Sequence, residues 1–299
     1  PKRTNLFHAA SVNIRMHVGL FPFLLSAQDC RTMLNSKCSL RSLIHTSLIF
    51  FGATLLLATN SAEPMQAQTI ETAIARGNLI LSDKFDRSLI DQDWWTNDSR
   101  AQKSANIAKN KMMPQVTIQG GVLQIRRTAG SDHAAVARTK VQFQNAVITC
   151  KFQLSENQKF GVNINDPNCK TVHAGHLCRV EISTKSVVIQ DQKTGNMANE
   201  YRKLKESGMS KADLAKRIKG KSKTTQSVTK ASQWHDLKIL LEGEKIVVQI
   251  DDKVVSQFSS SGIGHPTKEN IAFSVPRMVN IQDLAVYRIA PEQSGTEQP

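Results

Sequence analysis

Polar side chains able to contact a ligand gather between positions 163 and 181 of this sequence. The stretch combines amides, imidazoles, a guanidinium and a carboxylate. On one face of a sheet, such groups supply the directional hydrogen bonds that sugar hydroxyls require. An ordinary solvated strand face, with cross-strand charge pairing such as that between Lys151 and Glu181, explains the same residues. The candidate ligand-binding residues are Asn163, Asn165, His173, His176, Arg179 and Glu181.

Two histidines and two cysteines in this stretch raise the question of a metal site. Cys169, His173, His176 and Cys178 are residue types that bind zinc. Their spacing matches no standard zinc motif, and a disulfide between Cys169 and Cys178 that closes the loop explains the cysteines equally well. Cys150 lies within a strand pattern, which favours a buried free thiol. The sequence therefore assigns no metal ligand and no cofactor.

Adjacent tryptophans offer another means of contacting a sugar. On an extended chain Trp94 and Trp95 face opposite ways, so one of the two is predicted to fill the core and the other to face solvent. A solvent-facing indole could stack on a sugar ring. Trp234 precedes a strand pattern and is interpreted as structural.

The elements that must position these residues are strands. From 79 to 289 apolar and polar residues alternate with a period of two, the pattern of half-buried strands, and 147–154 is the clearest case. Turn signals at 242–244 and 251–252 indicate hairpins. About ten or more short strands without interleaved helices predict an all-β sandwich rather than an α/β sheet.

One segment departs from this alternation. Between 196 and 220 the period becomes helical, Gly208 separates two short runs, and Ser210 with Asp213 forms a capping box for the second run. Residues 191–230 carry 11 Lys and Arg against 4 Asp and Glu, a net of +7 out of +14 for the whole chain. The sequence thus predicts a basic helical hairpin inserted between two strands.

The charge of this insert suggests a partner. It could dock an acidic polysaccharide or an anionic envelope surface, and a solvated helical loop explains the same charges. Nucleic acid is disfavoured because Tyr201 is the only aromatic residue of 191–230 that could stack on bases.

An apolar run near the beginning has the order of a secretory signal. Basic residues precede Leu43–Thr59, and small residues follow it to Ala62 or Ala67. Its apolar core is shorter than the roughly 20 residues that span a bilayer, which favours cleavage over a transmembrane anchor, the alternative. Met33 would open a leader of ordinary length.

We therefore expect a leader at 1–67, with the signal peptide at 33–62 or 33–67 and with 1–32 untranslated as a hypothesis. The protein is predicted to be exported, to the periplasm or the extracellular space. The polar tail 291–299 is predicted to be disordered.

Several stretches resemble one protein family. They are LSDKFDRSLIDQDWWTNDS, GGVLQIRR, FQNAVITCKFQL, WHDLKILLEGEKIVVQIDDKVV, GIGHPTKENIAFSV and IQDLAVYRI. Together they are similar to the 3-keto-disaccharide hydrolase domain family of the concanavalin A-like lectin and glucanase superfamily, over residues 79–290. The resemblance implies a jelly-roll sandwich of two antiparallel sheets, with a curved outer face that holds sugars.

The resemblance implies a carbohydrate-associated protein, with a 3-keto-glycoside hydrolase or lyase-like domain. A non-catalytic lectin-like module and a cell-envelope interaction module are the alternatives. The strand of alternating carboxylates found in retaining glucanases of the superfamily is not present, and Asp251 and Asp252 are adjacent in a turn. Hydrolysis by two separated carboxylates is therefore not visible, and no catalytic residue is assigned.

Overall fold

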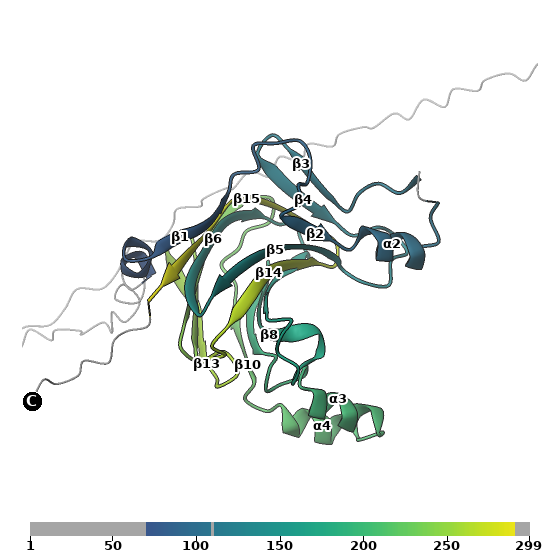
Figure 1. Cartoon of the computed structure of the whole chain (residues 1–299), viewed down its shortest axis with the longest axis vertical. Coiled ribbons are helices and arrows are strands. Elements are labelled where there is room, and N and C mark those ends of the chain that lie inside the picture. Colours follow the sequence, from purple (N-terminus) through teal and green to yellow (C-terminus); the bar gives the residue numbers. More distant parts are fainter. Residues whose placement is uncertain (1–69, 109–110, 291–299) are drawn as a thin grey trace, which may run out of the picture. The chain divides into compact units, whose positions relative to one another are not determined.

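Two antiparallel sheets stacked on each other make up the described part of the protein (Figure 1). The computed structural model describes residues 70–108 and 111–290. The predicted leader and the predicted tail lie outside these residues. Within them, no helix is long and apolar enough to cross a membrane.

Sheet A contains eight strands. They are β1 (Asn78–Asp83), β3 (Val116–Gln119), β4 (Val122–Arg126), β6 (Asn145–Gln153), β11 (Trp234–Glu242), β12 (Lys245–Ile250), β13 (Lys253–Ser259) and β15 (Met278–Ile289). The strand order is β13–β12–β11–β6–β15–β4–β3, and β1 also pairs with β15. The turns of the β11–β12 and β12–β13 hairpins fall at the two positions that the sequence predicted.

Sheet B contains seven strands. They are β2 (Trp94–Thr96), β5 (Ala135–Phe143), β7 (Lys159–Asn165), β8 (His176–Ser183), β9 (Ser186–Asp191), β10 (Ser222–Gln226) and β14 (Lys268–Val275). The strand order is β10–β9–β8–β7–β14–β5–β2. Strands distant in sequence lie side by side, so β14 brings residues near 272 between β7 and β5.

The core lies between the two sheets. Alternate residues of each strand point inward, as period-two burial requires. An aromatic contact joins the layers: Phe152 of sheet A lies 5.2 Å from Phe160 of sheet B, between ring centroids. Within sheet B, Phe160 lies 6.4 Å from Phe273. The predicted all-β sandwich is confirmed, and so is the buried free thiol of Cys150.

The pairing predicted between Lys151 and Glu181 is wrong. Lys151 lies on β6 of sheet A, whereas Glu181 lies on β8 of sheet B. The ion-pair partner of Lys151 is Asp283, at 3.9 Å between Nζ and Oδ2. Alternation identifies which residues share a face of one strand, but it does not assign strands to sheets, which explains the error.

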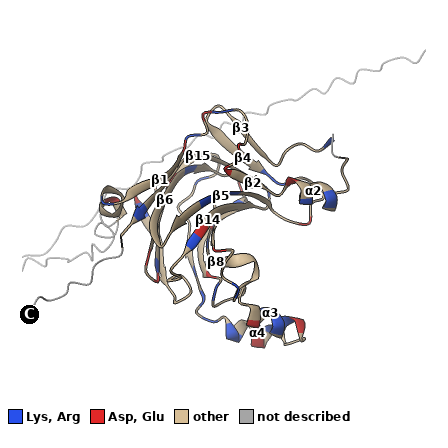
Figure 2. Ribbon diagram, in the orientation of Figure 1, with Lys and Arg blue, Asp and Glu red and all other residues tan. Residues whose placement is uncertain are grey.

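The predicted helical hairpin is present as α3 (Asn199–Glu206) and α4 (Lys211–Arg217), between β9 and β10. The side chain of Ser210 accepts a hydrogen bond from the backbone N–H of Asp213, which caps α4. Both basic and acidic side chains occupy the two helices, as Figure 2 shows. Two further helical elements are α2 (Asp98–Ser104) and the 3-10 turn η2 (His173–Gly175). Residues 70–75 are also helical.

The loop from 166 to 175 is closed by its backbone. Cys169 and Cys178 are both free, so the disulfide considered for this loop is not formed. Instead the N–H of Asp166 donates to the carbonyl of Gly175, at 2.8 Å. Gly175 has φ +74°, and a Cβ there would lie 2.3 Å from the carbonyl oxygen of Asp166. Only glycine allows this close approach.

A buried carboxylate links the end of β9 in sheet B to the segment that follows β13 in sheet A. Asp191 is 1 % exposed. It accepts hydrogen bonds from Ser260 Oγ at 2.5 Å and from Gly262 N at 3.0 Å, and two more from Thr194. Burial by itself raises the pKa of Asp191, but these hydrogen bonds outweigh it and leave the pKa below its usual value.

Replacing this carboxylate should destabilise the sandwich. We expect Asp191→Ala to lower the free energy of unfolding by roughly 2–4 kcal/mol, because buried N–H donors of Gly262 and Thr194 lose their acceptor. Urea unfolding at pH 7 measures the loss. Asp213→Ala, at an exposed carboxylate on α4, is the control and should lower the free energy of unfolding much less. Equal losses in the two variants would contradict the role assigned to Asp191.

Candidate functional site

Cross-strand neighbours line up across the outer face of sheet B. The successive partners on β9, β8, β7, β14, β5 and β2 are Gln190, Arg179, Asn163, Ala272, Arg138 and Trp95. The residues beside them in each strand, such as Val162 and Phe273, belong to the core. The row therefore points away from sheet A and forms one continuous surface.

A cavity of about 410 Å³ lies over the β8, β7 and β14 part of this row. We call it the central pocket. The residues of its lining used below are Lys159, Asn163, His176, Arg179, Glu181, Gln192, Met197 and Ser274. Four of the six residues predicted from the sequence, Asn163, His176, Arg179 and Glu181, are thus brought together.

Arg179 lies directly against the backbone of β7. A Cβ added to Gly161 would lie 2.3 Å from Nε of Arg179, so no side chain separates the guanidinium from the strand. The Nη2 group donates to Oε2 of Glu181 at 2.7 Å, and Lys159 contacts the other oxygen of that carboxylate at 3.0 Å. The Nε atom is buried and has no hydrogen-bond partner in the described part of the chain.

Burial also sets the electrostatics of this arginine. Removal from water lowers the pKa of Arg179, and the charge of Glu181 opposes that shift. Since the pKa of a free guanidinium lies far above neutral pH, Arg179 stays cationic at pH 7. The pocket lining therefore includes a fixed positive charge, and the Nε–H of this arginine has no partner among the described residues.

His176 is a neutral imidazole at the edge of the same pocket. Burial lowers its pKa to about 4, and the nearby His173 and Arg179 contribute to the shift. Its ring stacks on that of His173, with centroids 6.3 Å apart. Nδ1 of His176 is buried without a hydrogen-bond partner among the described residues. A neutral imidazole can accept or donate a proton through such a nitrogen.

Gln192 is the third residue of the central pocket, after Arg179 and His176, that has a buried polar atom without a partner among the described residues. Its side chain is held just beyond the end of β9, because its backbone N–H donates to the carbonyl of Leu177 at 2.9 Å. The residue is 2 % exposed, and its Oε1 atom has no partner in the described part of the chain. An unpaired buried polar atom is costly, so three of them around one cavity mark a place where a polar ligand would supply the missing hydrogen bonds.

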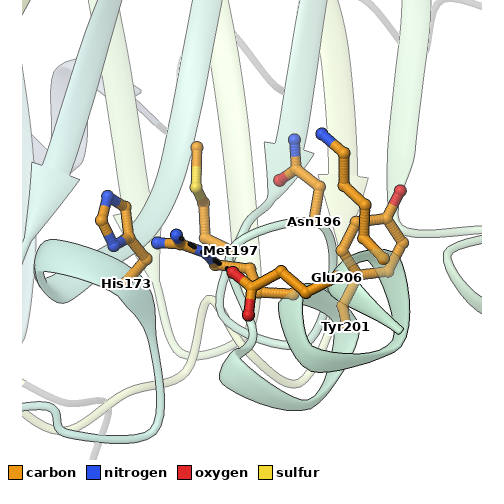
Figure 3. Close-up of a pocket in the computed structure, with 7 residues that line it drawn as sticks. His173, Asn196, Met197, Tyr201 and Glu206 are labelled. Atoms are coloured by element: carbon orange, nitrogen blue, oxygen red, sulfur yellow. Dashed lines mark ion pairs between the residues drawn. The ribbon is translucent and has the colours of Figure 1, made fainter. Parts of the chain in front are cut away.

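Asn163 and Asn165 have mainly structural partners. Nδ2 of Asn163 donates to the carbonyl of Ala272 at 3.1 Å and to Oγ of Ser274 at 3.0 Å, which ties β7 to β14. Asn165 bonds to Asn270 and does not line the central pocket. The sixth predicted residue, His173, lines a neighbouring cavity, shown in Figure 3.

Sequence reasoning missed Gly161, Gln192 and Ser274. A glycine inside a strand is a signal of close approach by another group, so Gly161 could have been found. Ser274 lies two residues after Ala272 on a predicted strand, and alternation places both on one face. Gln192 lies outside any strand, and no pattern in the sequence indicates where its side chain goes.

The prediction that one of the two adjacent tryptophans is buried and the other faces solvent is confirmed. Trp94 is 7 % exposed and packs on Phe273, whereas Trp95 is 48 % exposed. The guanidinium of Arg138 lies over the Trp95 ring, 4.5 Å from its centroid. Trp234, interpreted as structural, is 38 % exposed.

The described residues show no ready metal centre. Across 70–108 and 111–290, no group of three or more His, Cys, Asp and Glu side chains is placed to hold an ion.

A scan against known protein families matches residues 84–284 to the 3-keto-alpha-glucoside-1,2-lyase-like domain. The chain belongs to this family. Membership confirms the family resemblance found in the sequence and makes the chain a carbohydrate-active, hydrolase- or lyase-like module. A comparison with curated proteins finds no match.

Solved structures with the same fold include glucanases. The laminarinase from Rhodothermus marinus is 13% identical, with a TM-score of 0.50 over 72% of this chain and 98% of that one. A mutant of a non-specific endo-beta-1,3(4)-glucanase from family GH16, co-crystallized with 1,3-beta-D-cellotriosyl-glucose, is 12% identical, with a TM-score of 0.50 over 71% of this chain and 95% of that one. At these identities the likeness concerns the fold alone.

The neutral state of His176 in this lyase-like domain predicts a pH effect on stability. The histidine of the unfolded chain takes up a proton near pH 6.5, but His176 in the folded protein does so only near pH 4. Folding stability should therefore fall as the pH drops from about 6.5 to 4, by on the order of 2 kcal/mol from this residue.

The measurement compares urea unfolding at pH 7 and pH 4.5 in the wild type and in His176→Gln. The variant should lose less stability over that interval, since glutamine has no proton to take up. Parallel losses in the two proteins would show that His176 titrates alike in the folded and unfolded states.

Proposed function

We propose that the central pocket binds a 3-keto-α-glucoside and cleaves it by elimination across C1 and C2. The family description supplies the substrate class. The observation that carries the proposal is that three residues lining one cavity each have a buried polar atom with no partner among the described residues: Nε of Arg179, Nδ1 of His176 and Oε1 of Gln192.

The elimination needs one base and one group that stabilises negative charge. A ketone at C3 makes the proton on C2 acidic, and its removal leaves an enolate with the charge on the C3 oxygen. When the C3 carbonyl re-forms, a double bond forms between C1 and C2 and the C1–O bond to the aglycone breaks. The departing oxygen takes up a proton, so the products are an alcohol and an unsaturated ketone, with no net oxidation or reduction.

The pocket offers side chains for both tasks. Arg179 is a fixed cation with a free N–H, which suits an enolate oxygen that becomes negative during the reaction. His176 is neutral at pH 7 and can accept the C2 proton. Gln192 would accept a hydrogen bond from a sugar hydroxyl. Glu181 holds Arg179 in place through the 2.7 Å contact.

Elimination fits this pocket better than hydrolysis by two carboxylates. Glu181 is the only carboxylate among the residues that line the cavity, and it is engaged by Arg179 and Lys159. A pair of carboxylates, one of them free to act as an acid, is what classical glycoside hydrolysis requires. A non-catalytic sugar-binding module is the other function that the same cavity supports, and the assay below distinguishes it.

Turnover of p-nitrophenyl 3-keto-α-glucoside tests the proposal. Release of nitrophenol and the ultraviolet absorption of the unsaturated ketone report on the two products. We expect Arg179→Met to lower kcat/KM by about 10²-fold or more, because the enolate loses its cationic partner. His176→Ala should lower kcat by about 10²-fold or more.

Arg138→Met is the matched control. Arg138 lies on the same outer face in the same cross-strand row, and burial lowers the pKa of this arginine too, but it lies on β5 outside the central pocket. Its substitution should leave kcat/KM within about threefold. Binding without turnover in the wild type would exclude the enzyme and favour the binding module, and neither binding nor turnover would exclude both.

A further inference from the structure

A second cavity, of about 560 Å³, lies beside the central pocket. We call it the insert pocket, because most of its lining comes from the helical insert. Its walls are His173 on one side and Asn196, Met197, Tyr201, Arg202, Lys205 and Glu206 on the other (Figure 3). The elimination proposed above uses none of these side chains.

The two cavities are neighbours through shared and stacked residues. Met197 lines both of them. His173, in the wall of the insert pocket, stacks on His176, in the wall of the central pocket, at 6.3 Å between ring centroids. A ligand that fills the central pocket and continues past Met197 would therefore enter the insert pocket.

Backbone hydrogen bonds hold the insert against the loop that carries His173. The N–H of His173 donates to the carbonyl of Met197, and the N–H of Asn199 donates to the carbonyl of Thr171, both at 2.9 Å. Nδ2 of Asn199 also donates to the carbonyl of Lys170, at 2.7 Å. The start of α3 is thus fixed, and the insert pocket is preformed.

The insert pocket carries an excess of positive charge. Arg202 and Glu206 lie 3.7 Å apart between Nη2 and Oε1, a long contact that partly neutralises both. Lys205 has no ion-pair partner in the part of the chain that the structure describes. The ring of Tyr201 adds an apolar surface beside these charges (Figure 3). An aromatic ring next to an unpaired cation suits a sugar ring with an anionic substituent.

We propose that the insert pocket is the subsite for the leaving group, and that this group is a sugar bearing a carboxylate or a sulfate. The inference rests on the proposed function, since it assumes that the central pocket holds the α-glucoside ring. It gives the basic insert a role in substrate choice: Lys205 and Arg202 bind the anion, and the Tyr201 ring supports the sugar.

Binding of four sugars to the full chain tests this subsite by calorimetry. Methyl α-glucoside occupies the central pocket alone. The other three probes are an α-linked glucosyl-glucose, the corresponding glucosyl-glucuronate, and glucosyl-glucose 6-sulfate. We expect the two anionic disaccharides to bind about tenfold more tightly than the neutral one at low salt, and the gain to shrink at high ionic strength. The carboxylate and sulfate probes show which anion is preferred.

Substitutions on α3 identify the side chains that cause the preference for anionic sugars. Lys205→Met and Arg202→Met should each remove much of the preference for the anionic sugars, while Lys205→Arg keeps it and Glu206→Gln increases it. Lys203→Met is the matched control, since it removes the same charge from the same helix at an exposed position outside the pocket. All variants should bind methyl α-glucoside as the wild type does.

The outcomes separate the two proposals. If neither methyl α-glucoside nor p-nitrophenyl 3-keto-α-glucoside binds to the wild type, the central pocket is not the sugar site and the proposed function fails. If methyl α-glucoside binds but the neutral and anionic disaccharides bind equally, the leaving-group subsite is overturned while the central pocket stands. The subsite is also overturned if Lys203→Met lowers the preference as much as Lys205→Met does.

Discussion

The contact between the Arg179 guanidinium and the bare backbone of Gly161 is the constraint on which the site depends. Any side chain at that position would occupy the space of Nε. Because β7 presents no side chain there, the arginine of β8 can lie over its neighbour strand and still keep its salt bridge to Glu181. The rest of the sandwich serves to hold β7, β8 and β14 in the register that creates this contact.

The electrostatics of the pocket follow from that arrangement. A buried cation is costly unless it is paired, and Glu181 supplies the pair without using the Nε–H. Burial lowers the pKa of His176, the charges of His173 and Arg179 add to the shift, and the imidazole therefore stays neutral well below pH 7. A cation with a free donor and a neutral base next to it are what an enolate-forming reaction requires, whereas an acid and base pair of carboxylates is not available here.

The fold was largely predictable from the sequence, and the site only in part. Period-two burial across 79–289 identifies which side chains share a face, so Asn163, Arg179 and Glu181 could be placed together. Sheet membership depends on pairing between distant strands, which alternation within one strand does not specify, and Lys151 was therefore assigned to the wrong partner. His173 and Gln192 belong to connections, whose paths depend on tertiary hydrogen bonds.

The helical insert was likewise predictable in its local structure but not in its position. Its N-cap at Ser210 and its helical period were visible locally, and the structure has both. Its position beside the central pocket was not visible, because it depends on hydrogen bonds between 171–173 and 197–199. Export and the leader stay predictions, since those residues lie outside the described part of the chain.

An NMR titration with a 3-keto-α-glucoside tests the central claim most directly, by following the Nε–H signal of Arg179 and the amide of Gly161 in ¹H–¹⁵N spectra. The account predicts saturable shifts of both signals in the wild type, and loss of saturation over the same concentrations in Gly161→Ala, whose Cβ displaces the guanidinium. Shifts confined to sheet A, or equal affinity in Gly161→Ala, would contradict it.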